Sequence, residues 1–171
     1  MSLRKRTFLR IISGVVLLAI SMMLTFIIKE VLSARNPEGA LPTMQVAVGG
    51  TILPNQYTDL FSYSWRFLTS PIESGKTQED LAALPAAPVN PGDPIQFRFS
   101  YDASSVKISR AVEGSNVFYE VAASSTEDGV GILYTPEVAG IYTYQVQASW
   151  WLRGSVEYYF RISVQDTSRS A

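Results

Sequence analysis

Few side chains in this sequence are suited to catalysis, because the chain contains no histidine and no cysteine. The commonest general base, the commonest metal ligand and every thiolate are therefore missing. A serine nucleophile would need a lysine as its base. Lys76 lies in a long polar segment and Lys107 on the outward face of a predicted strand, so we interpret both as solvated. No catalytic residue is predicted, and the chain is expected not to be an enzyme.

The acidic residues form no pattern that predicts a metal or phosphate site. Glu79 with Asp80 and Glu127 with Asp128 are adjacent acids at a helix start and in a turn, where such residues are usually solubilising. A calcium loop needs alternating oxygen ligands, which these segments lack. The glycines of residues 48–51 (VGGT) have neither the lysine nor the following helix of a phosphate loop. We therefore expect no metal and no cofactor.

Aromatic residues are concentrated near the C-terminus, where residues 140–164 hold seven of the twenty in the chain. They alternate with polar residues at a period of two, which predicts two antiparallel strands joined by a turn at residues 152–155. Gly154 supplies the positive φ that the turn needs. The inward positions are Tyr142, Tyr144, Val146, Ala148 and Trp150 on the first strand, and Val156, Tyr158, Phe160, Ile162 and Val164 on the second.

Four large side chains of the predicted strands and turn do not belong to an inward face. Trp151 and Leu152 stand at the turn, and Tyr159 and Phe118 point outward by register. Exposed aromatic residues stack on sugars or anchor protein partners, so these four are the candidate contacts with a partner or ligand. The alternatives for Trp151 are that it closes one end of the fold or touches lipid headgroups.

An uncharged apolar run fills residues 11–28 and, as a helix, would span roughly 27 Å of the ~30 Å hydrocarbon core. Arg4, Lys5, Arg6 and Arg10 precede it without an acid, while Lys29 and Glu30 cancel after it. By the positive-inside rule the N-terminus stays in the cytoplasm and the rest is exported. We predict a single-pass signal anchor in the plasma membrane. The alternative is a signal peptide cleaved near residues 31–33.

The predicted organisation follows from this segment. Residues 1–7 form a basic cytoplasmic tail, 8–29 the transmembrane helix, 30–42 a linker, 43–166 the exported domain and 167–171 a disordered tail. From residue 33 onward, nine Lys and Arg face fourteen Asp and Glu, a net charge of −5. Phosphate backbones need clustered basic residues, so nucleic acid is excluded as a partner.

Apolar and polar residues alternate along most segments of the exported domain, which predicts an all-β, immunoglobulin-like sandwich of about seven antiparallel strands. The earlier strands are expected at residues 44–48, 63–67, 95–101, 106–110, 116–123 and 130–134, with Val117, Tyr119, Val121, Val130, Ile132 and Tyr134 inward on the last two. Residues 70–94 are too long for a hairpin and carry five prolines. They are expected to cross between the two sheets and to hold a short helix capped by Thr77 and Asp80.

The segment PEVAGIYTYQV, residues 136–146, resembles the corner before a late strand of immunoglobulin-like domains. The resemblance implies that Tyr142, after Gly140, bonds the backbone a few residues upstream and that Tyr144 replaces the usual cysteine. Trp65 would be the core tryptophan. As a whole the chain resembles small bacterial membrane-anchored envelope proteins with an extracytoplasmic immunoglobulin-like domain, which implies a fold and a location but no activity.

We therefore expect a non-enzymatic, membrane-anchored envelope protein whose β-sandwich binds an envelope or membrane protein. A cell-wall or carbohydrate ligand is the alternative. A hydrolase that uses unrecognised carboxylates is the third possibility, and two acids directed into one pocket would support it.

Overall fold

The structure is a computed structural model that describes residues 3–68, 71–115, 117–121, 124–125 and 131–165. Glu127, Asp128, Val130 and the predicted tail at 167–171 lie outside the described residues. The chain divides into two compact units, one that contains the N-terminal helix and one that begins at Leu41 and contains the strands.

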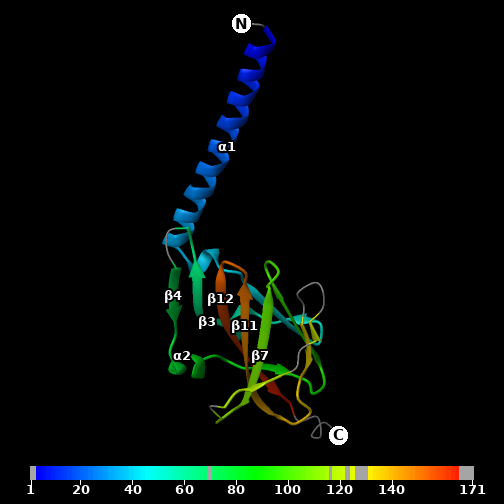
Figure 1. Cartoon of the computed structure of the whole chain (residues 1–171). Coiled ribbons are helices and arrows are strands. Elements are labelled where there is room, and N and C mark those ends of the chain that lie inside the picture. Colours follow the sequence, from blue (N-terminus) through cyan, green and yellow to red (C-terminus); the bar gives the residue numbers. More distant parts are fainter. Residues whose placement is uncertain (1–2, 69–70, 116, 122–123, 126–130, 166–171) are drawn as a thin grey trace. The chain divides into compact units, whose positions relative to one another are not determined.

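The N-terminal helix α1 spans Leu3–Arg35 (Figure 1). Its side chains from residue 10 to residue 26 are exposed on every face, and the helix is long and apolar enough to cross a membrane. It continues beyond the predicted end at residue 29, because no glycine or proline interrupts it before Pro37. The predicted linker is therefore helical in its first part and contains the short 3₁₀ helix η1 (Glu38–Ala40) after it.

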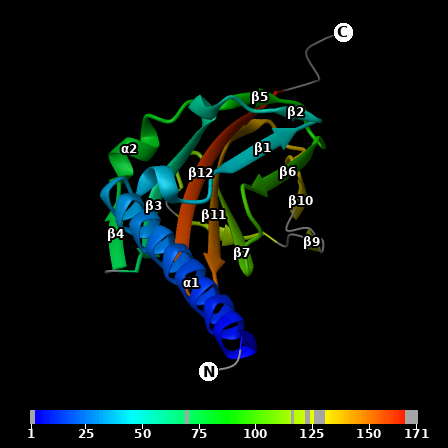
Figure 2. The same cartoon turned by 90° about the horizontal axis from the view of Figure 1, so that it is seen from above.

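Two β-sheets face each other in the second unit (Figure 2). The smaller sheet is antiparallel, in the order β2 (Thr51–Ile52), β1 (Met44–Val48), β6 (Pro94–Phe99), β10 (Gly131–Tyr134) and β9 (Ser124–Ser125). The larger sheet has the order β4 (Pro71–Gly75), β3 (Thr58–Arg66), β12 (Gly154–Val164), β11 (Gly140–Trp150), β7 (Ser105–Val112) and β8 (Tyr119–Glu120). The strand β5 (Ala87–Val89) runs parallel to the end of β12, and the 3₁₀ helix η2 (Asn55–Tyr57) precedes β3. The predicted β-sandwich after one apolar helix is confirmed.

The core is built on the β11–β12 hairpin, as the alternation predicts. Every residue from Gly140 to Trp150 is paired with one from Gly154 to Val164, and all ten predicted inward side chains are buried. The ring of Phe99, from the smaller sheet, lies 5.4 Å from that of Trp150 and 6.4 Å from that of Tyr158. Burial raises the pKa of Tyr158 to about 12. The aromatic residues of the hairpin thus hold the two sheets together.

The predicted tyrosine corner is present before β11. The hydroxyl of Tyr142 donates to the backbone oxygen of Val138 at 2.9 Å, and its side chain is buried. Gly140 begins the strand with a φ of 156° and lies against the Tyr142 ring. The corner ties the start of β11 to the loop that precedes it.

Residues 70–94 do connect the larger sheet to the smaller one, and they also add strands to the larger sheet. The strand β4 pairs with β3, the helix α2 (Gln78–Ala82) follows, and β5 pairs with β12. The Thr77 backbone N–H donates to Asp80 Oδ2 at 2.9 Å, and this bond lowers the pKa of the Asp80 carboxyl. Twelve strands are present among the described residues, rather than about seven.

Two predicted strand faces are wrong. In β10, Leu133 is paired with the buried Ile95 and is itself buried, whereas Tyr134 is 66% exposed. The register with β6 decides the face, because both faces of this segment are apolar. Among the described residues of the segment predicted as a strand at 116–123, Tyr119 and Glu120 form the edge strand β8, and Val117 and Tyr119 are exposed instead of buried.

The corner bond yields a stability prediction. Tyr142→Phe should lower the free energy of unfolding by about 1–2 kcal/mol, because the part-buried hydrogen bond from the buried Tyr142 side chain to the Val138 oxygen is lost. Chemical denaturation of the detergent-solubilised chain, followed by tryptophan fluorescence, measures this. Tyr134→Phe is the matched control at an exposed ring. Equal free energies for the two variants would contradict the role of the corner.

A second prediction concerns Gly154, which has a φ of 131° and begins β12. A Cβ placed there would lie 2.0 Å from the backbone oxygen of Ser64 on β3. Gly154→Ala should therefore lower the unfolding free energy by about 3 kcal/mol or more, through overpacking and backbone strain together. Gly50→Ala is the control, because Gly50 also has a positive φ but nothing within 4 Å of the added atom. A cost no larger than that of the control would show that β3 shifts to accommodate the methyl group.

Candidate functional site

The turn between β11 and β12 is held by backbone hydrogen bonds on both sides. The Trp151 N–H donates to Ser104 Oγ at 2.9 Å, and the Arg153 N–H donates to the Trp150 oxygen at 3.1 Å. The Arg66 N–H, at the end of β3, donates to the Arg153 oxygen at 2.6 Å. The three turn residues are therefore fixed by the sheet beneath them.

This turn displays the two residues predicted as contacts, Trp151 and Leu152, which we call the apolar tip. Trp151 is 82% exposed and Leu152 is 69% exposed. Leu152 also has a φ of 62°, the one positive value among the described non-glycine residues. A leucine in this conformation costs roughly 1–2 kcal/mol relative to the right-handed region. The chain thus tolerates both strain and apolar exposure here, and such outliers gather at functional positions.

Tyr159 and Phe118 lie elsewhere, and the predicted exposure of Tyr159 is wrong. Tyr159 is 5% exposed, because the rings of Phe61 and Phe118 cover it at centroid distances of 4.7 and 5.8 Å. An irregularity in the β3–β12 pairing between Glu157 and Tyr158 leaves Phe61 without a direct partner. Burial, then the bond from its hydroxyl to Glu157 Oε1 at 2.9 Å, raises the pKa of Tyr159. Phe118 is half-buried, and this aromatic cluster is part of the packing on the outer face.

Ser104 and Lys107 have the S-x-x-K spacing of some serine hydrolases, which sequence reasoning missed. The pattern lies on an extended segment, where residues three apart face opposite sides. Lys107 Nζ forms an ion pair with Glu120 at 3.0 Å, and Ser104 Oγ accepts the Trp151 N–H. The two side chains are thus engaged separately and do not form a nucleophile–base pair.

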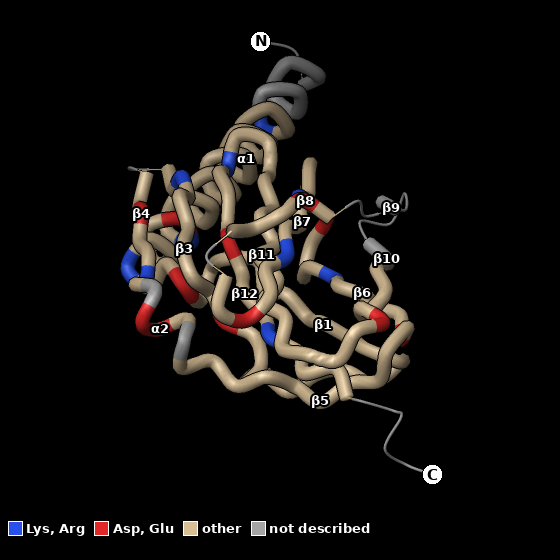
Figure 3. Tube along the Cα trace, turned by 90° about the horizontal axis from the view of Figure 1, so that it is seen from below, with Lys and Arg blue, Asp and Glu red and all other residues tan. Residues whose placement is uncertain are grey.

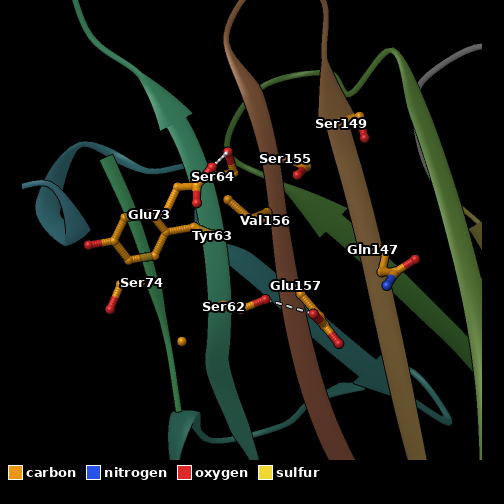
Figure 4. Close-up of a pocket in the computed structure, with 11 residues that line it drawn as sticks. Ser62, Tyr63, Ser64, Glu73, Ser74, Gln147, Ser149, Ser155, Val156 and Glu157 are labelled. Carbon is orange, nitrogen blue, oxygen red and sulfur yellow. Dashed lines mark hydrogen bonds between the residues drawn. The ribbon is translucent and has the colours of Figure 1, made fainter. Parts of the chain in front are cut away.

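A shallow groove of about 640 Å³ lies on the outer face of the larger sheet (Figure 4). It arises from two rows of residues in register across adjacent strands. One row is Glu73, Ser64, Ser155 and Ser149, and the other is Gly75, Ser62, Glu157 and Gln147. Small residues dominate the rows, so the surface is hollowed there. We call this feature the polar groove.

Two carboxylates line the polar groove. Glu157 accepts hydrogen bonds from Ser62 Oγ at 2.7 Å, from the Tyr159 hydroxyl at 2.9 Å and from Gln145 Nε2. Glu73 accepts from Ser64 Oγ at 3.0 Å. These carboxylates and the serine hydroxyls beside them offer both acceptors and donors, which suits recognition of hydroxyl, amide or cationic groups.

Sequence reasoning missed the polar groove because no single segment contains it. Its residues come from β4, β3, β12 and β11, and they meet only once the strand register is known. The available signal was weak: serines at outward positions of several predicted strands. Among the described residues, no group of His, Cys, Asp and Glu is arranged to hold a metal ion.

Comparison with known proteins finds no matching family model, no matching curated protein and no matching solved structure. The function is therefore argued from the surfaces of this chain alone.

The strain at the apolar tip can be tested directly. Leu152→Asn should leave the unfolding free energy unchanged or raise it by up to about 1 kcal/mol, because asparagine adopts a positive φ more readily. Ile52→Asn, at an exposed apolar residue of β2, should be neutral or destabilising. Denaturation of the solubilised variants measures both. If Leu152→Asn were the more destabilising of the two, Leu152 would stabilise the fold and would not be a strained residue kept for contact.

Proposed function

We propose that this chain is a non-enzymatic, membrane-anchored envelope protein whose β-sandwich binds another protein. The exposed apolar surface of α1 supports the anchor, since leaving such a surface in water costs about 25 cal/mol for each Å². The basic flank before the apolar run favours a cytoplasmic N-terminus and an exported sandwich. The absence of histidine and cysteine from the sequence supports a binding role over catalysis. Glu73 and Glu157 do line one groove, the arrangement that would support a hydrolase, but each already accepts a hydrogen bond from a neighbouring serine, which favours binding.

We infer further that the sandwich is of the immunoglobulin type. The order β1-β6-β10-β9 in one sheet and β7-β11-β12 in the other corresponds to strands ABED and CFG of that fold. The tyrosine corner precedes β11, which is the strand F equivalent. Two departures are Tyr144 at the cysteine position of strand F, where it stacks on Phe160 of the neighbouring strand, and Trp65 on the additional strand β3. Immunoglobulin-like domains often serve as recognition modules, which agrees with the proposal by analogy of fold.

The polar groove is the feature that most supports the proposed binding of a protein. It presents two carboxylates, several hydroxyls and the Gln147 amide on one sheet, and the chain from residue 33 onward has a net charge of −5. Acidic and basic positions are interspersed over the described part of the sandwich (Figure 3). A partner segment with basic and amide side chains would find complementary groups there. Its partner is expected to be a membrane or envelope protein, since the anchor keeps the sandwich near the bilayer.

A carbohydrate or cell-wall ligand is the second candidate. The volume of about 640 Å³ lies in the range of small-molecule sites, and serine hydroxyls with carboxylates can bond sugar hydroxyls. The one aromatic residue that lines the groove is Tyr63, which is 8% exposed. A sugar ring would thus lack an open aromatic face on which to stack. This difference favours a protein partner.

Charge reversal in the polar groove tests the proposal. Glu73→Lys should reduce capture of the partner from detergent-solubilised membranes by about tenfold or more, the equivalent of 1.4 kcal/mol. Quantitative crosslinking and pull-down with the full chain measure it. Glu79→Lys, an exposed acid in the first turn of α2, is the matched control and should capture as the parent does. Equal capture by both variants would count against the groove as the contact.

The same pair of variants separates the two ligand classes. The full chain is sedimented with purified peptidoglycan. If the parent chain sediments, and Glu73→Lys weakens this binding while Glu79→Lys does not, the ligand of the groove is a carbohydrate and not a protein. No sedimentation by the parent chain would remove the carbohydrate candidate.

A further inference from the structure

We infer that the apolar tip docks on the surface of the bilayer that holds α1, with Trp151 and Leu152 in the interface between headgroups and acyl chains. This inference rests on the proposed membrane anchor. It assigns the tip to lipid, whereas the polar groove is assigned to the protein partner.

The chemistry around the tip matches a lipid interface. Trp151 and Leu152 border a hollow of about 550 Å³, and Arg66 and Arg153 line the same hollow. Tryptophan is enriched at headgroup level, where its ring is partly in hydrocarbon and its N–H reaches water. Arginine side chains nearby extend toward lipid phosphates. Two exposed apolar residues that share a hollow with two arginines are thus an interfacial arrangement.

The position of the tip within the sandwich supports the same conclusion. Residues that enter β1 from the anchor pair with the end of β6, since Met44 is opposite Phe99 and the Thr43 N–H donates to Ser100 Oγ at 3.1 Å. That end of β6 contacts the base of the tip: the Phe99 ring lies 5.4 Å from Trp150. The chain therefore enters the sandwich at the end that carries the tip.

A short tether limits how far this end can lie from the membrane. Helix α1 ends at Arg35 and β1 begins at Met44, so eight residues connect them. Eight extended residues reach at most about 30 Å, and the helical residues 30–35, beyond the predicted membrane-spanning segment, add roughly 9 Å. Because the connection joins the sandwich at the tip end, that end is the one that the tether keeps within reach of the bilayer.

The tip is also organised in advance for contact. Its backbone is bonded to Ser104 on one side and to Arg66 on the other. Insertion therefore costs little conformational entropy, and most of the free energy of the apolar contact with lipid contributes to the binding free energy. Leu152, which has a positive φ, and Trp151 are both exposed at this turn.

Quenching by brominated lipid tests the inference on the full chain. The protein is reconstituted with the sandwich outside into vesicles of phosphatidylcholine and phosphatidylglycerol, with brominated acyl chains on the phosphatidylcholine. Bromine quenches only tryptophans that it touches, and Trp65 and Trp150 are buried. The parent chain should lose fluorescence on bromination, and Trp151→Phe should abolish that loss. Leu152→Asp keeps Trp151 and should weaken the quenching, because a carboxylate resists entry into the interface.

The outcomes separate failure of the tip from failure of the anchor. Quenching that is the same in the parent chain and in Trp151→Phe overturns the inference. If the chain nevertheless stays in the vesicles through an alkaline carbonate wash, the anchor stands and only the docking fails. Loss of the chain in that wash removes the proposed anchor and the inference with it. Unquenched Trp151 together with loss of partner capture in Trp151→Ala would assign the tip to a protein and overturn the lipid contact.

Discussion

The pairing of β11 with β12 is the interaction on which the rest of this structure depends. Eleven residue pairs hold the two strands together, and five consecutive inward side chains on each strand are buried. The strand β7 pairs with the free edge of β11, while β3 and then β5 share the free edge of β12. The smaller sheet packs on the aromatic inner face through Phe99. If the hairpin did not form, none of these strands would have its register.

The same hairpin positions both candidate surfaces. Because side chains alternate between faces, the register that buries Tyr144 and Phe160 also places Gln145, Gln147, Ser149 and Glu157 on the outer face. A slip of one residue would exchange these sets and destroy core and groove together. The end of the hairpin forms the apolar tip. Core packing and surface chemistry are therefore set by one pairing.

Whether a feature can be predicted from the sequence depends on how far apart in the sequence its contacting residues lie. The hairpin, the capping of α2 and the Tyr142 corner depend on residues close in sequence, so alternation and spacing suffice to predict them. The face of β10 depends on its pairing with β6, and a segment with Leu133 and Tyr134 side by side is apolar on both faces. Long-range pairing decides such cases, and local pattern does not contain it.

The candidate site shows the same division. The exposure of Trp151 and Leu152 follows from their place in a turn between two alternating strands, which the sequence indicates. The burial of Tyr159 requires Phe61 on β3 and Phe118 in the segment before β8, and the polar groove requires four strands in register. These features arise from tertiary structure, and a single period of two along one strand does not predict them.

The polar groove and the hollow beneath the tip share Ser64 and Ser149 in their linings, so the two surfaces are continuous on the outer face. A tip in contact with lipid would therefore hold the groove beside the bilayer and fix the orientation of the sheet toward it. A short tether alone leaves rotation of the sandwich unrestricted, and a second contact removes that freedom. A membrane partner would then meet a groove that is already held close to the membrane surface. Its association would therefore have a smaller entropic cost. The strain at Leu152 and the exposure of Trp151 would be the stability given up for that orientation.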